Sequence, residues 1–236
     1  MSLLLVADHA SNVVPDSIEL NIPAAWFGEH IAVDLGSAAL TLALQADFGC
    51  RAVLAEVSRL VVDVNREPER ADLIPEYSDG RVIAGNVGLP DNDRRHRVER
   101  YFTPYHAAIE AAVAARRPSL IVSIHSFTPQ LASRSDAARP WPIGILYNRD
   151  ARAAVLGIAY LREQGFDAGD NEPYSGRDLN YTMNRHAEAT DIKYLGFEVR
   201  QDLLADVAGI ARWSKVLSGC IRHVARALAL NLRDIA

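Results

Sequence analysis

The stretch that decides the fold is LLLVA at residues 3–7, which is followed at once by the polar block DHASN at residues 8–12. Five apolar residues are too few for a helix, but they suffice for a strand that is buried on both faces, as in a parallel sheet. The polar block would then lie at the carboxyl end of this strand. Open α/β sheets carry their functional sites at that edge.

The rest of the chain alternates between helix-like and strand-like segments. Helical spacing of apolar residues predicts helices at 31–48 (capped by Gly49), 97–115, 151–164 (closed by Gly165) and 210–228. Short apolar runs predict further strands at 51–57, 60–64, 119–124, 143–147 and 194–199. Long loops are predicted at 65–94 and 130–142, where no period is visible. We therefore expect one α/β domain over residues 1–236, with a mostly parallel or mixed sheet between helices on both faces.

Composition excludes several classes of protein. The chain has 236 residues, 49% of them hydrophobic, with 14 Gly and 11 Pro, which fits neither a disordered chain nor a coiled coil. A formal net charge of −5 argues against a nucleic-acid-binding protein. No apolar run reaches the roughly 18 to 20 residues of a membrane span, and no basic segment of a signal peptide opens the chain. We expect a cytoplasmic protein without nucleic-acid or membrane partners, and a homo-oligomer is compatible with the sequence.

Two histidines fall at predicted strand ends. His9 follows the first strand, and His125 ends the strand around residues 119–124. Such a pair can share one zinc ion with a carboxylate as third ligand and water in the open position. A single histidine at such a place more often caps a strand or forms a hydrogen bond in the core. Two in equivalent places favour the metal interpretation.

Glu198 lies within the otherwise apolar strand at 194–199. Burying an ionised carboxylate costs several kcal/mol unless it is paired, so its side chain must point to a partner or into a cleft. One interpretation is an ion pair with Arg200 or another arginine. The other is a general base that takes a proton from metal-activated water and passes it to a leaving nitrogen.

The segment SRLVVDVNR at residues 58–66 combines an apolar strand pattern with charged side chains. In a strand, Asp63 and Asn65 would share a face and Arg66 would follow at the edge. A guanidinium group beside an amide suits a substrate carboxylate. The alternative is a strand end with a salt bridge to Asp63.

Four blocks of the sequence resemble those of N-formylglutamate amidohydrolases. They are DHASNVVP (8–15), the pattern S-R-x-x-x-D-x-N-R (58–66), ERYFTPYH (99–106) and IHSFTP (124–129). Together with Asp34 and Glu198, the resemblance spans almost the whole chain. It implies the fold of zinc carboxypeptidases and aspartoacylases, a role in amino-acid catabolism, and a Zn²⁺-dependent hydrolase whose small-molecule substrate is an N-acyl amino acid.

The resemblance also implies roles for single residues. Asp63, Asn65 and Arg66 would hold a substrate carboxylate, and Arg59 would polarise the scissile carbonyl. Relatives with carboxypeptidase-like sites place a ligand glutamate three residues after the first histidine, where this chain has Asn12. The third metal ligand beside His9 and His125 is therefore open. Asp34 is the first choice, because it supplies a carboxylate, and Asp8 and Asn12 are the alternatives.

The polar stretch at residues 174–181 and the residues just beyond it contain Arg177 and Arg185. Either arginine can meet a second substrate carboxylate if this segment closes over the site, whereas a solvated surface loop is the simpler interpretation. The expected activity is release of a formyl or other acyl group from an acidic amino acid. The alternatives are a deacylase or carboxypeptidase for another acyl amino acid or short peptide, and a metal-free binding protein on the same fold.

Overall fold

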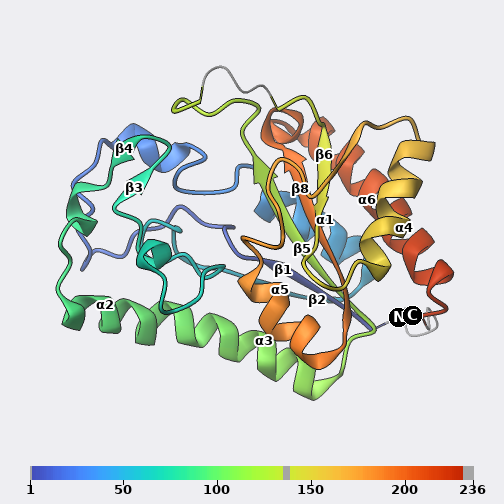
Figure 1. Cartoon of the computed structure of the whole chain (residues 1–236), viewed down its shortest axis with the longest axis horizontal. Coiled ribbons are helices and arrows are strands. Elements are labelled where there is room, and N and C mark those ends of the chain that lie inside the picture. The colour runs from blue at the N-terminus through green and yellow to red at the C-terminus, as the bar shows by residue number, and fades with distance from the viewer. Residues whose placement is uncertain (1, 135–138, 231–236) are drawn as a thin grey trace.

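The computed structural model describes residues 2–134 and 139–230. Its centre is a six-stranded sheet with the strand order β2-β1-β5-β8-β6-β7 (Figure 1). The strands are β1 (Leu3–Ala7), β2 (Arg51–Leu54), β5 (Leu120–Phe127), β6 (Ile143–Leu146), β7 (Ala168–Asp170) and β8 (Lys193–Arg200). All neighbouring pairs are parallel except β6 and β8. The prediction of a mostly parallel or mixed α/β sheet is confirmed.

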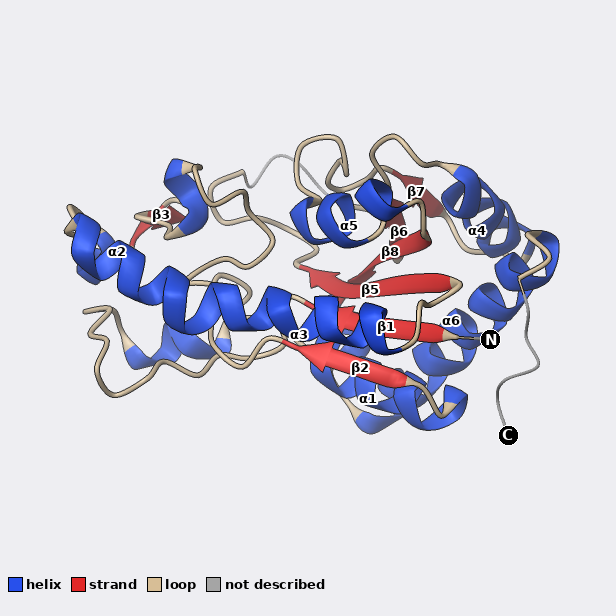
Figure 2. Cartoon of the chain, turned by 90° about the horizontal axis from the view of Figure 1, so that it is seen from below, coloured by secondary structure: helices blue, strands red, loops and turns tan. Residues whose placement is uncertain are grey.

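Helices cover both faces of this sheet, which gives three layers (Figure 2). One layer holds α1 (Ser37–Phe48), α4 (Arg152–Glu163) and α6 (Val207–Ala227), and the other holds α3 (Thr103–Ala115) and α5 (Tyr181–His186). Leu3 and Leu5 of β1 belong to the core beneath the first layer, whereas Leu4 and Val6 belong to the core beneath the second. Side chains of a strand alternate between faces, so a strand covered on both sides is apolar throughout.

The first helix begins later than its apolar spacing predicts. Residues 31–36 form turns, and α1 starts at Ser37, because Gly36 has a φ of 81° that no helix interior accepts. A Cβ at position 36 would lie 2.5 Å from Cβ of Leu204, so only glycine fits there. The helix ends at Gly49, with a φ of 57°, as predicted. Asp34 consequently precedes the helix, and its backbone N–H donates to the carbonyl oxygen of His9 at 3.0 Å.

The prediction of a strand at residues 60–64 is wrong. Leu60 and its apolar neighbours are fully buried, but they lie in an irregular segment. Local side-chain hydrogen bonds replace a strand ladder here: the hydroxyl oxygen of Ser58 accepts from the N–H of Leu60, and the carboxylate of Asp63 accepts from the N–H of Asn65. Serine and aspartate compete with regular structure in this way.

The predicted loop at 65–94 carries structure of its own. It contains a hairpin of β3 (Tyr77–Ser78) and β4 (Arg81–Val82) and the start of α2 (Asp91–Arg97), which continues through a π-helical turn (Val98–Phe102) into α3. Figure 2 shows the hairpin and α2 on the side to which the arrowheads of β1 and β5 point. This segment therefore extends beyond the carboxyl edge of the sheet.

Other boundaries follow the prediction more closely. The second long loop, at 130–142, contains no helix or strand in its described part, and residues 135–138 lie outside the described residues. β7 and α5, of three and six residues, were not predicted because such short elements leave no periodic pattern. α6 buries the expected face, including Trp213 and Leu217. Within the described part of the chain, no helix combines the length and hydropathy needed to cross a membrane.

Candidate metal and active site

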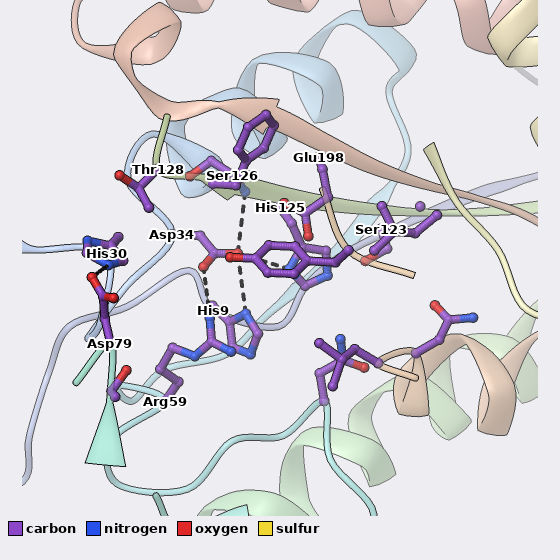
Figure 3. Close-up of a pocket in the computed structure, with 18 of the residues that line it drawn as sticks. His9, His30, Asp34, Arg59, Asp79, Ser123, His125, Ser126, Thr128 and Glu198 are labelled. Atoms are coloured by element: carbon purple, nitrogen blue, oxygen red, sulfur yellow. Dashed lines mark hydrogen bonds and ion pairs between the residues drawn. The ribbon is translucent and has the colours of Figure 1, made fainter. Parts of the chain in front are cut away.

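A cavity of about 290 Å³ lies at the carboxyl ends of the central strands. His9 follows β1, and both His125 and Glu198 lie near the carboxyl ends of their strands, β5 and β8. Their side chains line the cavity together with Asp34 (Figure 3). The polar residues at the predicted strand ends are thus brought together at one place, as expected for an open α/β sheet.

The two histidine rings meet at the carboxylate of Asp34. Its Oδ2 atom lies 3.3 Å from Nδ1 of His9 and 2.9 Å from Nδ1 of His125. All three side chains are buried, and one potential ligand atom from each lies within 4.8 Å of the others. Two imidazoles and one carboxylate are a donor set that zinc uses in proteins.

The outer nitrogen of each ring faces a second carboxylate. Nε2 of His9 lies 2.7 Å from Oδ1 of Asp63, and Nε2 of His125 lies 3.1 Å from Oδ2 of Asp8. Burial alone would raise the pKa of Asp63, but Arg66, His9 and Arg59 outweigh it and hold that pKa well below its ordinary value. An ionised carboxylate is an acceptor and favours a proton on the ring nitrogen that faces it, while the inner nitrogens of both rings face Asp34.

This arrangement attracts positive charge. Burial opposes ionisation of His125, but its contacts with Asp34 and Asp8 prevail and raise its pKa well above the ordinary value. The pKa of Asp34 is lowered, because His9 and His125 outweigh the opposing effect of burial. His9, Asp34 and His125 can therefore lie this close together when either protons or a metal cation stand between the two rings and the carboxylate.

The alternatives for the third ligand have other places. Asp8 lies behind His125, where its Oδ1 accepts hydrogen bonds from the hydroxyl groups of Tyr105 at 2.6 Å and Thr182 at 2.9 Å. Asn12 donates through Nδ2 to the carbonyl oxygen of Phe27 at 2.9 Å. Asp34 is the carboxylate that faces both histidines.

Glu198 is adjacent to His125 in the pairing of β5 and β8. Its side chain is buried, and its Oε2 atom has no hydrogen-bond partner within the described residues. Arg200, the partner considered from the sequence, instead pairs with Asp202 at 2.8 Å. Burial is the main cause that raises the pKa of Glu198 to about 7. A carboxyl group in this state can both accept and return a proton near neutral pH.

The residues of the D-x-N-R pattern do not all face the cavity. Asn65 and Arg66 line the cavity, whereas Asp63 turns to His9 and to Arg59, whose Nη2 lies 2.8 Å from Oδ2 of Asp63. Asn65 accepts from the backbone N–H of Thr182 at 3.0 Å. Arg66 uses Nε and Nη1 for local hydrogen bonds, and its Nη2 has no partner in the described structure.

Arg59 also lines the cavity, and its Nη1 lies 3.3 Å from Oδ1 of Asp34. The structure does not bring Arg177 or Arg185 to this cavity. Arg177 is exposed, and Arg185 pairs with Glu110 at 2.8 Å and lies over the ring of Tyr181. Both side chains belong to the surface, although the stretch at residues 174–181 itself contributes Tyr174, Leu179 and Asn180 to the lining of the cavity.

Sequence reasoning missed His30 and Asp79, which also line the cavity, and it named Tyr174 only as part of the polar stretch at residues 174–181. Of these residues, only Asp79 belongs to a sequence pattern that could have indicated its place. Asp79 and Gly80 are an Asp-Gly pair, which is a strong indicator of a two-residue hairpin turn. His30 and Tyr174 lie in irregular segments, where no periodicity shows the direction of a side chain.

Comparisons with known proteins identify a family and similar folds. A family model of N-formylglutamate amidohydrolases matches residues 1–205. The fold is similar to that of a gene product from Agrobacterium tumefaciens, with a TM-score of 0.92, 29% identity, and coverage of 97% of this chain and 92% of that one. It is also similar to an N-formylglutamate amidohydrolase from Ralstonia eutropha JMP134, with a TM-score of 0.73, 19% identity, and coverage of 95% and 93%. A search of curated proteins found no match.

The family match covers most of the chain and includes every residue of the cavity described above. The same strand ends that carry the histidines and Glu198 lie inside the matched region. The chain therefore belongs to the N-formylglutamate amidohydrolase family.

Proposed function

We propose that the protein is a zinc-dependent amidohydrolase that releases formate from N-formylglutamate or a closely similar N-acyl acidic amino acid. The substrate class follows from the family to which the chain belongs. The observation that carries the metal dependence is the convergence of His9, Asp34 and His125 within 4.8 Å. Asp63 bonds to the outer nitrogen of His9 and Asp8 faces that of His125, so a metal cation would find the inner nitrogens of both rings directed toward Asp34.

The charges around the cavity fit a divalent ion. Four buried carboxylates belong to the site, and two guanidinium groups lie close to them; these residues are Asp8, Asp34, Asp63 and Glu198, and Arg59 and Arg66. With neutral histidines the carboxylates exceed the guanidinium groups by two charges, which one divalent cation would offset. His9, Asp34 and His125 would hold it. When bound, zinc supplies Lewis acidity, which polarises an amide carbonyl and lowers the pKa of water.

Glu198 would move the proton. Its carboxylate accepts a proton from the water whose oxygen bonds to the formyl carbon. The same proton then passes to the amide nitrogen as the C–N bond breaks, so that formate and the free amino acid leave. A pKa near 7 suits both halves of this transfer.

The remaining groups would bind and orient the substrate. Arg59 presents positive charge beside Asp34 and can stabilise the oxygen that becomes negative in the transition state. Asn65 and the free Nη2 of Arg66 would hold the α-carboxylate. We assign Asp63 to the orientation of His9 instead of to the substrate, because its carboxylate is bonded to His9 and Arg59.

The test is release of formate by the chelator-treated protein before and after addition of zinc. The substrates are N-formyl-L-glutamate, N-acetyl-L-glutamate and a glutamyl dipeptide. We expect no turnover without metal, recovery with zinc, and preference for the formyl substrate. A preference for the acetyl substrate or the dipeptide would indicate a deacylase or peptidase, and binding without turnover of any substrate would indicate a binding protein.

A further inference from the structure

A hairpin turn lines one end of the cavity. Asp79 and Gly80 form this turn between β3 and β4, with φ values of 45° and 75°. The carboxylate of Asp79 accepts hydrogen bonds from the backbone N–H groups of Ala132 and Ser133, at 2.8 and 2.9 Å, and from the hydroxyl of Ser133. These bonds fasten the segment after β5 to the hairpin.

The same carboxylate holds His30. Nε2 of His30 lies 3.0 Å from Oδ2 of Asp79, whose side chain is only 2% exposed. Burial opposes ionisation of Asp79, but its hydrogen bonds with Ser133 and Ala132 prevail and lower its pKa to about 2. Asp79 is therefore an acceptor, and the proton of this bond belongs to Nε2 of His30. Nδ1 of His30 has no hydrogen-bond partner in the described part of the chain.

His30 is the lining group that can still gain positive charge. Figure 3 shows His30 and Asp79 beyond Asp34, at the end of the cavity away from Glu198. Arg59 and Arg66 are already bonded to carboxylates. Tyr174 accepts a hydrogen bond from Arg139 at 2.9 Å. Of the ionisable side chains that line the cavity within the described residues, His30 alone remains both outside the proposed machinery and able to become a cation.

Three charged side chains near His30 affect its pKa. Asp79 favours its protonation, and so does Glu29, whereas burial and Arg81 oppose it. Glu29 and Arg81 pair with each other at 2.6 Å, so their opposite effects are close together. The balance lowers the pKa of His30, mainly through burial, and so favours its neutral form at pH 7.

We propose that Nδ1 of His30 binds the distal carboxylate of an N-acyl dicarboxylic amino acid and takes up a proton from solvent as the substrate binds. The imidazolium would then lie between two carboxylates, that of the substrate and that of Asp79. A neutral side-chain amide in the same place needs no proton. His30 would therefore determine specificity for an acidic side chain, an inference that rests on the proposed function.

The experiment compares kcat/KM for N-formyl-L-glutamate and N-formyl-L-glutamine between pH 6 and 8.5, with the zinc-loaded enzyme. The ratio of the two values cancels every titration that both substrates share. One proton taken up per molecule of acidic substrate makes the ratio fall by about five- to tenfold per pH unit above pH 7. In His30→Gln we expect a ratio that is independent of pH. His96→Gln, which changes an exposed histidine of α2, should behave as the wild type.

A flat ratio in the wild type would overturn the role of His30 without any variant being needed. A falling ratio that persists in His30→Gln would overturn it as well. In both cases hydrolysis itself leaves the proposed function intact. If neither substrate is hydrolysed, the proposed function fails and this inference fails with it.

Discussion

Nε2 of His9 lies 2.7 Å from Oδ1 of Asp63, and both side chains are buried. The same carboxylate accepts a hydrogen bond from Arg59 through its other oxygen. Asp63 thus orients the His9 ring and favours a proton on the nitrogen that faces away from Asp34. A segment that resembles a substrate-binding element in sequence thus also contacts His9, one of the proposed metal ligands.

Asp63→Asn should weaken zinc binding by about 10- to 100-fold, because the outer carboxylate of a histidine ligand typically contributes that much to metal affinity. The measurement is competition with a chromophoric chelator. Asn12→Ala is the control, since Asn12 bonds to Phe27 outside the site. Wild-type affinity in Asp63→Asn would remove Asp63 from the support of His9.

Glu198→Gln should retain zinc and substrate binding but lose about 10² to 10⁴ in kcat, because an amide keeps the shape of the side chain and lacks its basic oxygen. Single-turnover formate release, with KM measured alongside, separates chemistry from binding. A kcat within about threefold of wild type would make Glu198 a structural residue, at odds with its Oε2 atom, which has no hydrogen-bond partner among the described residues.

Arg66→Ala should lower kcat/KM for N-formyl amino acids by about ten- to a hundredfold, because a hydrogen bond to a charged group contributes about 1.5 to 3 kcal/mol. Substrates whose α-carboxylate is replaced by an amide should lose much less. Arg66→Lys should recover only part of the loss, since it lacks the planar fork. Equal losses on acid and amide substrates would place the α-carboxylate elsewhere.

A buried histidine pair should make the fold sensitive to acid. Nδ1 of His106 lies 2.8 Å from Nε2 of His186, and burial together with nearby positive charge lowers the pKa of each to about 4. Between pH 6.5 and 4 the two histidines are protonated in the unfolded chain but remain neutral in the folded protein. The free energy of unfolding should therefore fall as pH falls, by about 1.4 kcal/mol per pH unit for each histidine.

Urea unfolding of the metal-free protein at pH 7 and pH 5 measures this dependence. The loss of stability between the two pH values should be smaller in His186→Gln by about 1 to 3 kcal/mol. His96→Gln should show the wild-type loss, since His96 is exposed. An unchanged loss in His186→Gln would mean that other groups cause the acid sensitivity.

Sequence patterns predicted the parts of the site that depend on strand ends. An apolar run that stops at a polar residue locates the carboxyl edge of a sheet, so His9 and His125 could be placed before their distance was known. Hydrogen bonds between residues that are far apart in the sequence leave no such pattern. Thr182 supports Asp8 across 174 residues, and Asp79 holds His30 across 49. The strand period also does not apply along the irregular path of residues 60–66, where Asn65 lines the cavity and Asp63 bonds to His9 instead of sharing its face.

Zinc content after reconstitution tests the central claim most directly. Protein stripped with a chelator is loaded with excess zinc, desalted and analysed by atomic emission. We expect one equivalent in the wild type and in the control His96→Ala, and far less than one in His9→Ala and in His125→Ala, while circular dichroism shows that both variants remain folded. A full equivalent of zinc in both site variants, bound with wild-type affinity, would contradict the assignment of the metal to His9, Asp34 and His125.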